Sequence, residues 1–113
     1  MTVLRILVCG GRDFTDEVKL IEELNKHQFS LLITGVARGA DMLAYNYATK
    51  NKIPIASFPA NWKLYGKRAG FVRNTQMLRE GKPELIIAFA GGFGTAMMCK
   101  IGENAGVRVL RVP

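Results

Sequence analysis

A short aliphatic run that ends in clustered glycines constrains the fold of this 113-residue chain more than any other feature. Residues 85–89 are apolar, and Ala90-Gly91-Gly92-Phe93-Gly94-Thr95 leads from them into a segment of helical character. Short apolar runs are typical of strands buried on both faces, as in parallel sheets. Glycine lets the backbone turn and approach a ligand closely, and a helix N-terminus favours an anion. The segment therefore predicts a strand, a phosphate-binding turn and a helix.

Strands and helices are expected to alternate along the whole chain. The apolar runs predict strands over residues 3–8, 31–34, 53–58, 85–89 and 107–112. Helices are expected from Thr15 or Asp16 to about residue 26, from about residue 39, over 71–79, and from the glycine turn to about residue 105. Residues 59–70 are expected to be irregular. Pro54 within the third run indicates a strand at the edge of the sheet.

This alternation predicts an α/β fold, a Rossmann-like three-layer sandwich with helices on both faces of the sheet. About five parallel strands are expected in the order 3-2-1-4-5, within one domain over residues 1–113. The first and fourth strands are then neighbours at the switch point, where such sheets bind ligands. The turns Gly10-Gly11 and Gly91-Gly92 are therefore expected side by side.

The net charge of +7 favours an anionic partner, either a phosphorylated small molecule or nucleic acid. Among 113 residues there is no apolar run of the roughly 20 residues that a membrane span needs. The N-terminal residues lack the layout of a secretory signal, so we expect no membrane association and a cytoplasmic location.

A metal site of cysteine and histidine ligands is not expected, because the chain has two distant cysteines, Cys9 and Cys99, and one histidine, His27. The cysteines are expected to be small apolar residues of the core or near the surface. His27 is expected at a helix end, where it faces solvent or the helix dipole. No metal and no cofactor are predicted.

Each turn at a predicted strand end carries groups that suit a nucleotide. Arg12 can donate two hydrogen bonds to an anion, or pair with Asp13 in solvent. Asp41 can accept from a ribose or a base edge, or only cap its helix. The glycines have the alternative role of tight packing. The candidate ligand-binding residues are Gly10, Gly11, Arg12, Gly35, Arg38, Gly39, Asp41, Arg73, Asn74, Gly91, Gly92, Phe93, Gly94 and Thr95.

Two further segments leave their roles open. Arg73 and Asn74 begin the third predicted helix, where they face either phosphate and base or only solvent. Trp62 and Tyr65 either stack on a base or belong to the core or an interface. The turn at residues 91–95 is neither a Walker A loop nor a GxGxxG fingerprint, because the following lysine and the spacing are absent.

Four motifs in this order resemble the SLOG superfamily, which joins the DNA-processing Smf proteins to the LOG nucleotide hydrolases. They are Gly10-Gly11-Arg12-Asp13-Phe14, Gly35-Val36-Ala37-Arg38-Gly39-Ala40-Asp41, Arg73-Asn74 and Gly91-Gly92-Phe93-Gly94-Thr95. The resemblance covers nearly the whole chain and is closest to the small single-domain branch found in bacteria and phages. It implies a Rossmann-like fold that binds a nucleotide or nucleotide derivative at the predicted crevice.

The chain departs from LOG enzymes where they carry their catalytic glutamates. Ala90 stands in place of a proline, and Ala96, Met97 and Met98 stand where the acids would lie. The resemblance therefore implies binding without turnover, as a sensor or a sequestering protein. The alternative is a nucleotide N-glycosidic hydrolase with Asp41 as its acid or nucleophile.

A second alternative is a single-stranded DNA-binding protein of the Smf type, in which a similar arginine-glycine motif occurs and to which the positive charge is suited. A homodimer or higher homo-oligomer is also expected, on the ground that Met97 and Met98 are exposed apolar residues of a helix.

Overall fold

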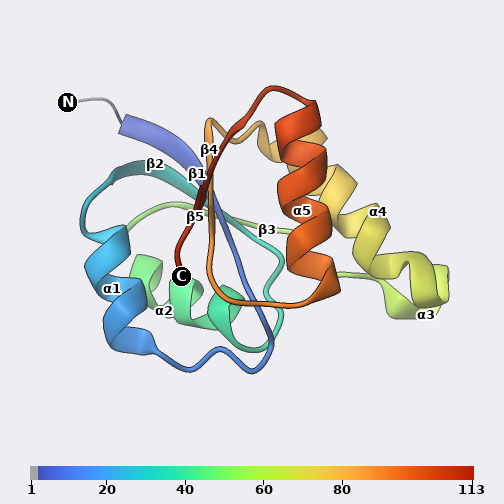
Figure 1. Ribbon diagram of the computed structural model, residues 1–113, viewed down its shortest axis with the longest axis horizontal. Helices are drawn as coiled ribbons and strands as arrows, with labels where there is room; N and C mark the ends of the chain where they lie inside the picture. The colour runs from blue at the N-terminus through green and yellow to red at the C-terminus, as the bar shows by residue number, and fades with distance from the viewer. Residues whose placement is uncertain (1–2) are drawn as a thin grey trace.

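The strands of the computed structural model, which describes residues 3–113, are β1 (Val3–Cys9), β2 (Gln28–Thr34), β3 (Ile55–Ser57), β4 (Leu85–Ala88) and β5 (Arg108–Arg111). All pair in parallel, in the order β3-β2-β1-β4-β5. The predicted strand order is therefore confirmed. The central strand β1 pairs with both β2 and β4, which places the ends of β1 and β4 next to each other (Figure 1).

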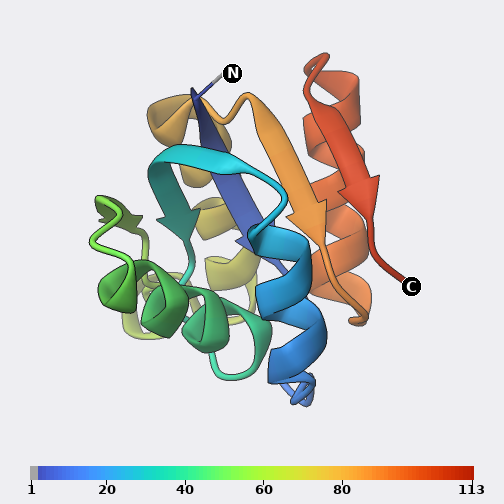
Figure 2. The same ribbon diagram turned by 90° about the vertical axis from the view of Figure 1, so that its left-hand side faces the viewer.

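Helices cover both faces of this sheet (Figure 2). Helices α1 (Glu17–Leu24) and α2 (Ala40–Lys50) pack on one face, and α4 (Ala69–Gln76) and α5 (Phe93–Asn104) lie on the other. Successive residues of an apolar strand serve opposite faces. In β4, Leu85 and Ile87 belong to the core under α1 and α2, whereas Ile86 and Ala88 belong to the core under α5. The predicted three-layer sandwich is confirmed.

Two boundaries on the N-terminal side differ from the expected ones. Asp16 is the N-cap of α1, and its Oδ1 accepts a hydrogen bond from the Lys19 amide at 3.1 Å. The helix ends at Leu24, before the expected residue 26, and β2 begins at Gln28, ahead of the expected residue 31. The first part of β2 has exposed polar residues. Residues 28–30 therefore do not extend the continuous apolar run on which the strand prediction rests.

The segment expected to be irregular is partly helical, which corrects the prediction for residues 59–70. Asn61 caps the short helix α3 (Trp62–Tyr65) by accepting a hydrogen bond from the Leu64 amide at 3.0 Å. A 3₁₀ turn over Gly66–Arg68 then leads into α4, which begins two residues before the expected position 71. A π-helical turn over Met77–Gly81 completes the segment. The sequence signal for α3 is its N-cap residue Asn61, and a search for apolar periodicity does not detect such a signal.

The edge strands are shorter than predicted. Pro54 directly precedes β3 rather than lying within it, and its carbonyl oxygen accepts from the Leu32 amide at 2.8 Å. The expected edge position of that strand is confirmed. The last strand, β5, likewise loses a residue at each end of its predicted range.

Cys9 and Cys99 are both buried, in the core between the sheet and α5, as expected. None of the helices formed by residues 3–113 has the length and apolar character needed to span a bilayer.

Candidate ligand-binding site

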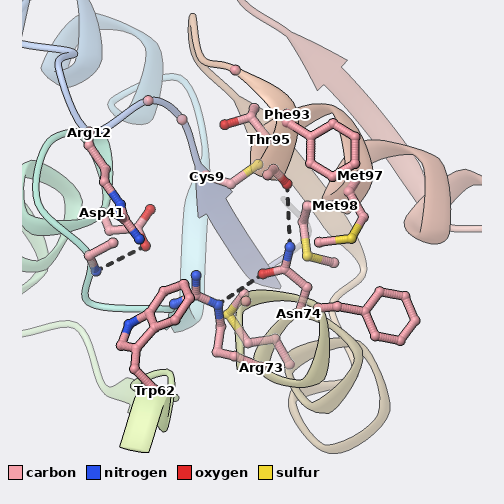
Figure 3. Close-up of a pocket in the computed structure, with 18 of the residues that line it drawn as sticks. Cys9, Arg12, Asp41, Trp62, Arg73, Asn74, Phe93, Thr95, Met97 and Met98 are labelled. Carbon is pink, nitrogen blue, oxygen red and sulfur yellow. Dashed lines mark hydrogen bonds between the residues drawn. The ribbon is translucent and has the colours of Figure 1, made fainter. Parts of the chain in front are cut away.

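A cavity of about 460 Å³ opens at the carboxyl edge of the sheet, between the β1 and β4 turns and the helices α4 and α5 (Figure 3). The Gly11 amide donates to the Ala90 carbonyl at 2.8 Å, so the two glycine turns lie side by side as predicted. Most of the predicted ligand-binding residues line this cavity: Gly10, Gly11, Arg12, Asp41, Arg73, Asn74, Gly92, Phe93, Gly94 and Thr95.

The remaining predicted residues lie outside this cavity. Gly35 and Arg38 line a smaller adjoining cavity. Gly91 faces a third hollow near the C-terminal residues. Gly39 packs behind the β1 turn, against the backbone of residues 11 and 12.

Several of the glycines are required by the packing of the chain on itself. Gly39 has a φ of +89°, and a Cβ there would overlap the Gly11 carbonyl oxygen. A Cβ at Gly91 would overlap the Gly11 amide nitrogen, and one at Gly35 would overlap the Arg73 guanidinium. Since residues 11, 39 and 91 belong to three different turns, these close approaches hold the turns in fixed positions around the cavity.

Gly92 and Gly94 differ from these residues because no neighbour among residues 3–113 occupies the place of their missing side chains. A Cβ at either position would have no neighbour within 4 Å. Gly92 is the N-cap of α5 and supplies no capping side chain, so the first amides of this helix have no side-chain acceptor at the cap. Backbone at the start of a twelve-residue helix is thus left bare beside the cavity.

A hydrogen-bonded network connects three elements around the cavity floor (Figure 3). Arg73 donates from Nε to Asn74 Oδ1 and from Nη1 to the Gly35 carbonyl, both at 2.9 Å. Asn74, which is buried, donates from Nδ2 to the Gly94 carbonyl at 3.3 Å. The network fixes α4 against both the β2 turn and the start of α5. Asn74 is therefore a positioning residue whose amide oxygen and nitrogen are both already engaged.

Asp41 is a buried carboxylate in the first turn of α2. Its Oδ2 accepts from the Ala37 amide at 3.2 Å. Burial raises the pKa of Asp41 from 3.8 to about 6, and this outweighs the Ala37 amide and the Arg73 and Arg12 charges, which lower it. The carboxyl group is therefore able to exchange a proton near neutral pH while facing the cavity.

Cys9 contributes its thiol to the same cavity. A hydrogen bond with Cys99, together with burial, holds the pKa of Cys9 well above its ordinary value. Since the thiolate is the nucleophilic form, Cys9 is an inert wall of the cavity.

Other residues line the cavity whose role the sequence analysis either did not predict or left open. Trp62, Lys67 and Phe71 form an exposed rim, and Trp62 faces the cavity, whereas Tyr65 lines a different hollow. Met97 and Met98 form part of the apolar wall seen opposite Arg12 in Figure 3. The expected exposure of both methionines is wrong, because Met98 is buried and Met97 is partly buried. A homo-oligomer and a nucleic-acid partner stay predictions.

The comparison with known families, rather than the fold alone, places this Rossmann-like chain in the SLOG superfamily. Within it, the model of the YspA, cpYpsA-related SLOG family (YAcAr) matches residues 4–65, just over half of the chain, and the chain belongs to this family. The chain is also similar to the Gene 61 protein of Mycobacterium phage D29, with 30% identity over an alignment of 118 positions that covers 94% of each chain. Membership of a SLOG family indicates a nucleotide-related function.

Proposed function

We propose that the chain binds a nucleotide or nucleotide-derived ligand in the 460 Å³ cavity, as a sensor or a sequestering protein without turnover. The observation that carries this proposal is the bare backbone of Gly92 and Gly94 at the start of α5. Glycines that the protein's own packing does not need are suited to the close approach of a ligand. The free amides and the dipole of a helix start favour phosphate there.

The charges around the cavity are suited to such a ligand. Arg12 and Arg73 line it on the side opposite Phe93 and Met97, so one wall is cationic and the other apolar (Figure 3). In the proposed complex the α5 amides and the Thr95 hydroxyl hold a phosphate, and the arginines neutralise its charge. The base then contacts the apolar wall. Asp41 is better placed than Asn74 to read the sugar or base, because the Asn74 amide group is already engaged.

The scarcity of acids supports binding without turnover. Of the cavity-lining residues within 3–113, only Asp41 carries a carboxylate. Asp13 is fully exposed, and Glu103 is engaged with Arg111 through contacts of 2.9 and 3.0 Å. Glycoside hydrolysis generally employs a pair of carboxylates on opposite sides of the scissile bond.

A thermal-shift panel tests the proposal. AMP, ADP-ribose, NAD and cyclic dinucleotides are offered in turn, and a ligand that binds the folded state raises the melting temperature by linkage. Arg12→Ala should remove most of the shift. Arg108→Ala, which deletes the same charge at the exposed start of β5, should retain it. Absence of a shift with every nucleotide would contradict the proposal.

One observation favours a second candidate, the N-glycosidic hydrolase. The pKa of Asp41, raised to about 6, lies where a general acid works well near neutral pH. If Asp41 is that acid, the protein releases free base from a nucleoside monophosphate, and the rate declines as pH rises through about 6. Asp41→Asn should abolish the release. Chromatography of wild type and variant with each monophosphate decides between turnover and binding alone.

A further inference from the structure

We infer that a smaller cavity beside the main one is a second anion subsite, so that the ligand is a nucleotide with two separate anionic groups. This inference rests on the proposed function of the main cavity. The smaller cavity has a volume of about 300 Å³ and lies between the β1 and β2 turns and the segment before α3. It shares Arg12, Ala37, Trp62 and Arg73 with the main cavity, so one ligand can extend from one space into the other.

The charge of the smaller cavity is its most informative property. Arg12, Arg38 and Arg73 all line it, and within residues 3–113 no acidic residue does. Guanidinium groups gathered around one hollow repel one another; the Asp41 carboxylate offsets part of this repulsion at Arg73, and a bound anion would offset more of it. Because Arg prefers planar, bidentate contact with phosphate or carboxylate, either of these groups is suited to the space.

The three arginines retain donors for such an anion. Arg38 Nη2 lies 3.5 Å from Asp13 Oδ1, but the two side chains are 75% and 100% exposed, so solvent screens this pair. Arg73 spends two N–H groups on Gly35 and Asn74 and keeps the rest of its fork. Among the described residues, Arg12 has no carboxylate oxygen within 4 Å.

Arg12 and Trp62 form the partition between the two cavities, and this pair of side chains is suited to a nucleotide. The Arg12 guanidinium lies over the Trp62 ring, 5.5 Å from its centroid, and both residues line both spaces (Figure 3). Arg38 donates from Nε to the Arg12 carbonyl at 3.3 Å, which fixes the two turns relative to each other. A nucleoside that passes this partition has an aromatic and a guanidinium plane to stack on, with anion sites on either side.

Inorganic phosphate distinguishes the two subsites without any assumption about the base. Amide NMR spectra are recorded during a phosphate titration at constant ionic strength. The wild type should respond in two groups of resonances, residues 92–95 and residues 36–38. Arg38→Ala should weaken the response at 36–38 more than at 92–95, and Arg108→Ala should leave both unchanged. Silence at 36–38 while 92–95 respond overturns the second subsite alone. Silence at 92–95 overturns the proposed function and, with it, the two-ended ligand.

A linear dinucleotide, 5′-phosphoadenylyl-adenosine, then tests the two-ended ligand against AMP. Joining two anions in one molecule raises the effective concentration of the second, so the wild type should bind the dinucleotide at least about tenfold more tightly than AMP. Arg38→Ala should reduce this ratio towards one, and Arg108→Ala should not change it. Equal affinity of the wild type for both probes overturns the inference.

Discussion

Two groups of glycines at the same sheet edge look alike in the sequence and differ in their surroundings. Gly39 and Gly91 are pressed against the Gly11 turn and Gly35 against the Arg73 side chain, whereas Gly92 and Gly94 face open space. The first group is explained by the protein's own packing. The second is not, and it lies beside the cavity. Glycines of the same type therefore have two roles at this edge: the packed ones bring the turns together, and the open ones leave the start of α5 uncovered beside the cavity.

The largest expected effect tests the packed group. Gly39→Ala should lower the free energy of unfolding by more than about 4 kcal/mol, because a strained backbone costs about 1–3 kcal/mol and overlap with the Gly11 carbonyl adds to it. Gly66→Ala is the matched control: Gly66 has a similar backbone, with φ +56° and ψ −131°, but open space around it. Urea unfolding of Gly66→Ala should show only the cost of the strained backbone. Equal losses in the free energy of unfolding for the two variants would contradict the packing role of Gly39.

The next effect concerns Asp41, a cavity-lining carboxyl group whose burial costs stability. The folded-state pKa of Asp41 is about 6, above its ordinary 3.8, so the wild type loses stability as pH rises through this interval, by up to about 3 kcal/mol. Asp41→Asn does not titrate. It should therefore be more stable than the wild type above pH 6, with the difference shrinking towards pH 4.

Urea unfolding of both proteins across this pH range measures the effect. Two parallel stability curves would show that the Asp41 carboxyl is not destabilised by burial.

A smaller effect of opposite sign tests the open group. Gly94→Ala should raise the free energy of unfolding by about 0.5–1 kcal/mol, because alanine favours a helix and has room here. It should also reduce the nucleotide-induced shift in melting temperature, since the methyl group lies beside the bare amides.

Gly102→Ala in the same helix is the control, because its Cβ would overlap Ile86 and it should be destabilising by about 1–3 kcal/mol. Gly94→Ala with full ligand response would place the ligand away from α5.

The smallest effect on stability is expected at the rim. Trp62 is 50% exposed, so Trp62→Ala should change the free energy of unfolding by no more than about 1 kcal/mol, the loss of one exposed cation–π contact. Ligand binding should nevertheless change the surroundings of Trp62. Trp62 is the one tryptophan of the chain, so nucleotide binding should change the intrinsic fluorescence. Unchanged emission at saturating ligand would remove Trp62 from the site.

Strand order and the main cavity were predictable because they depend on local patterns. Five apolar runs separated by helical segments leave few topologies, and the strand order brings Gly11 and Ala90 together. The short helix α3 was not predictable from apolar periodicity, since one asparagine cap defines it. The burial of Met98 depends on how α5 rotates against the sheet. The distinction between packed and open glycines needs three-dimensional neighbours, which no sequence pattern contains.

The cavity combines two segments that lie far apart along the chain. Residues 9–41 supply Arg12 and Asp41, and residues 62–98 supply Arg73 with its network, the rim and the glycine turn at the start of α5. The family match ends at residue 65, close to the boundary between them. We therefore expect relatives that match over the first segment to share the Arg12 and Asp41 side of the cavity and to differ more in the residues of the second segment. Exchanging residues 66–113 between two such relatives tests whether ligand selectivity follows the second segment, Arg73 included.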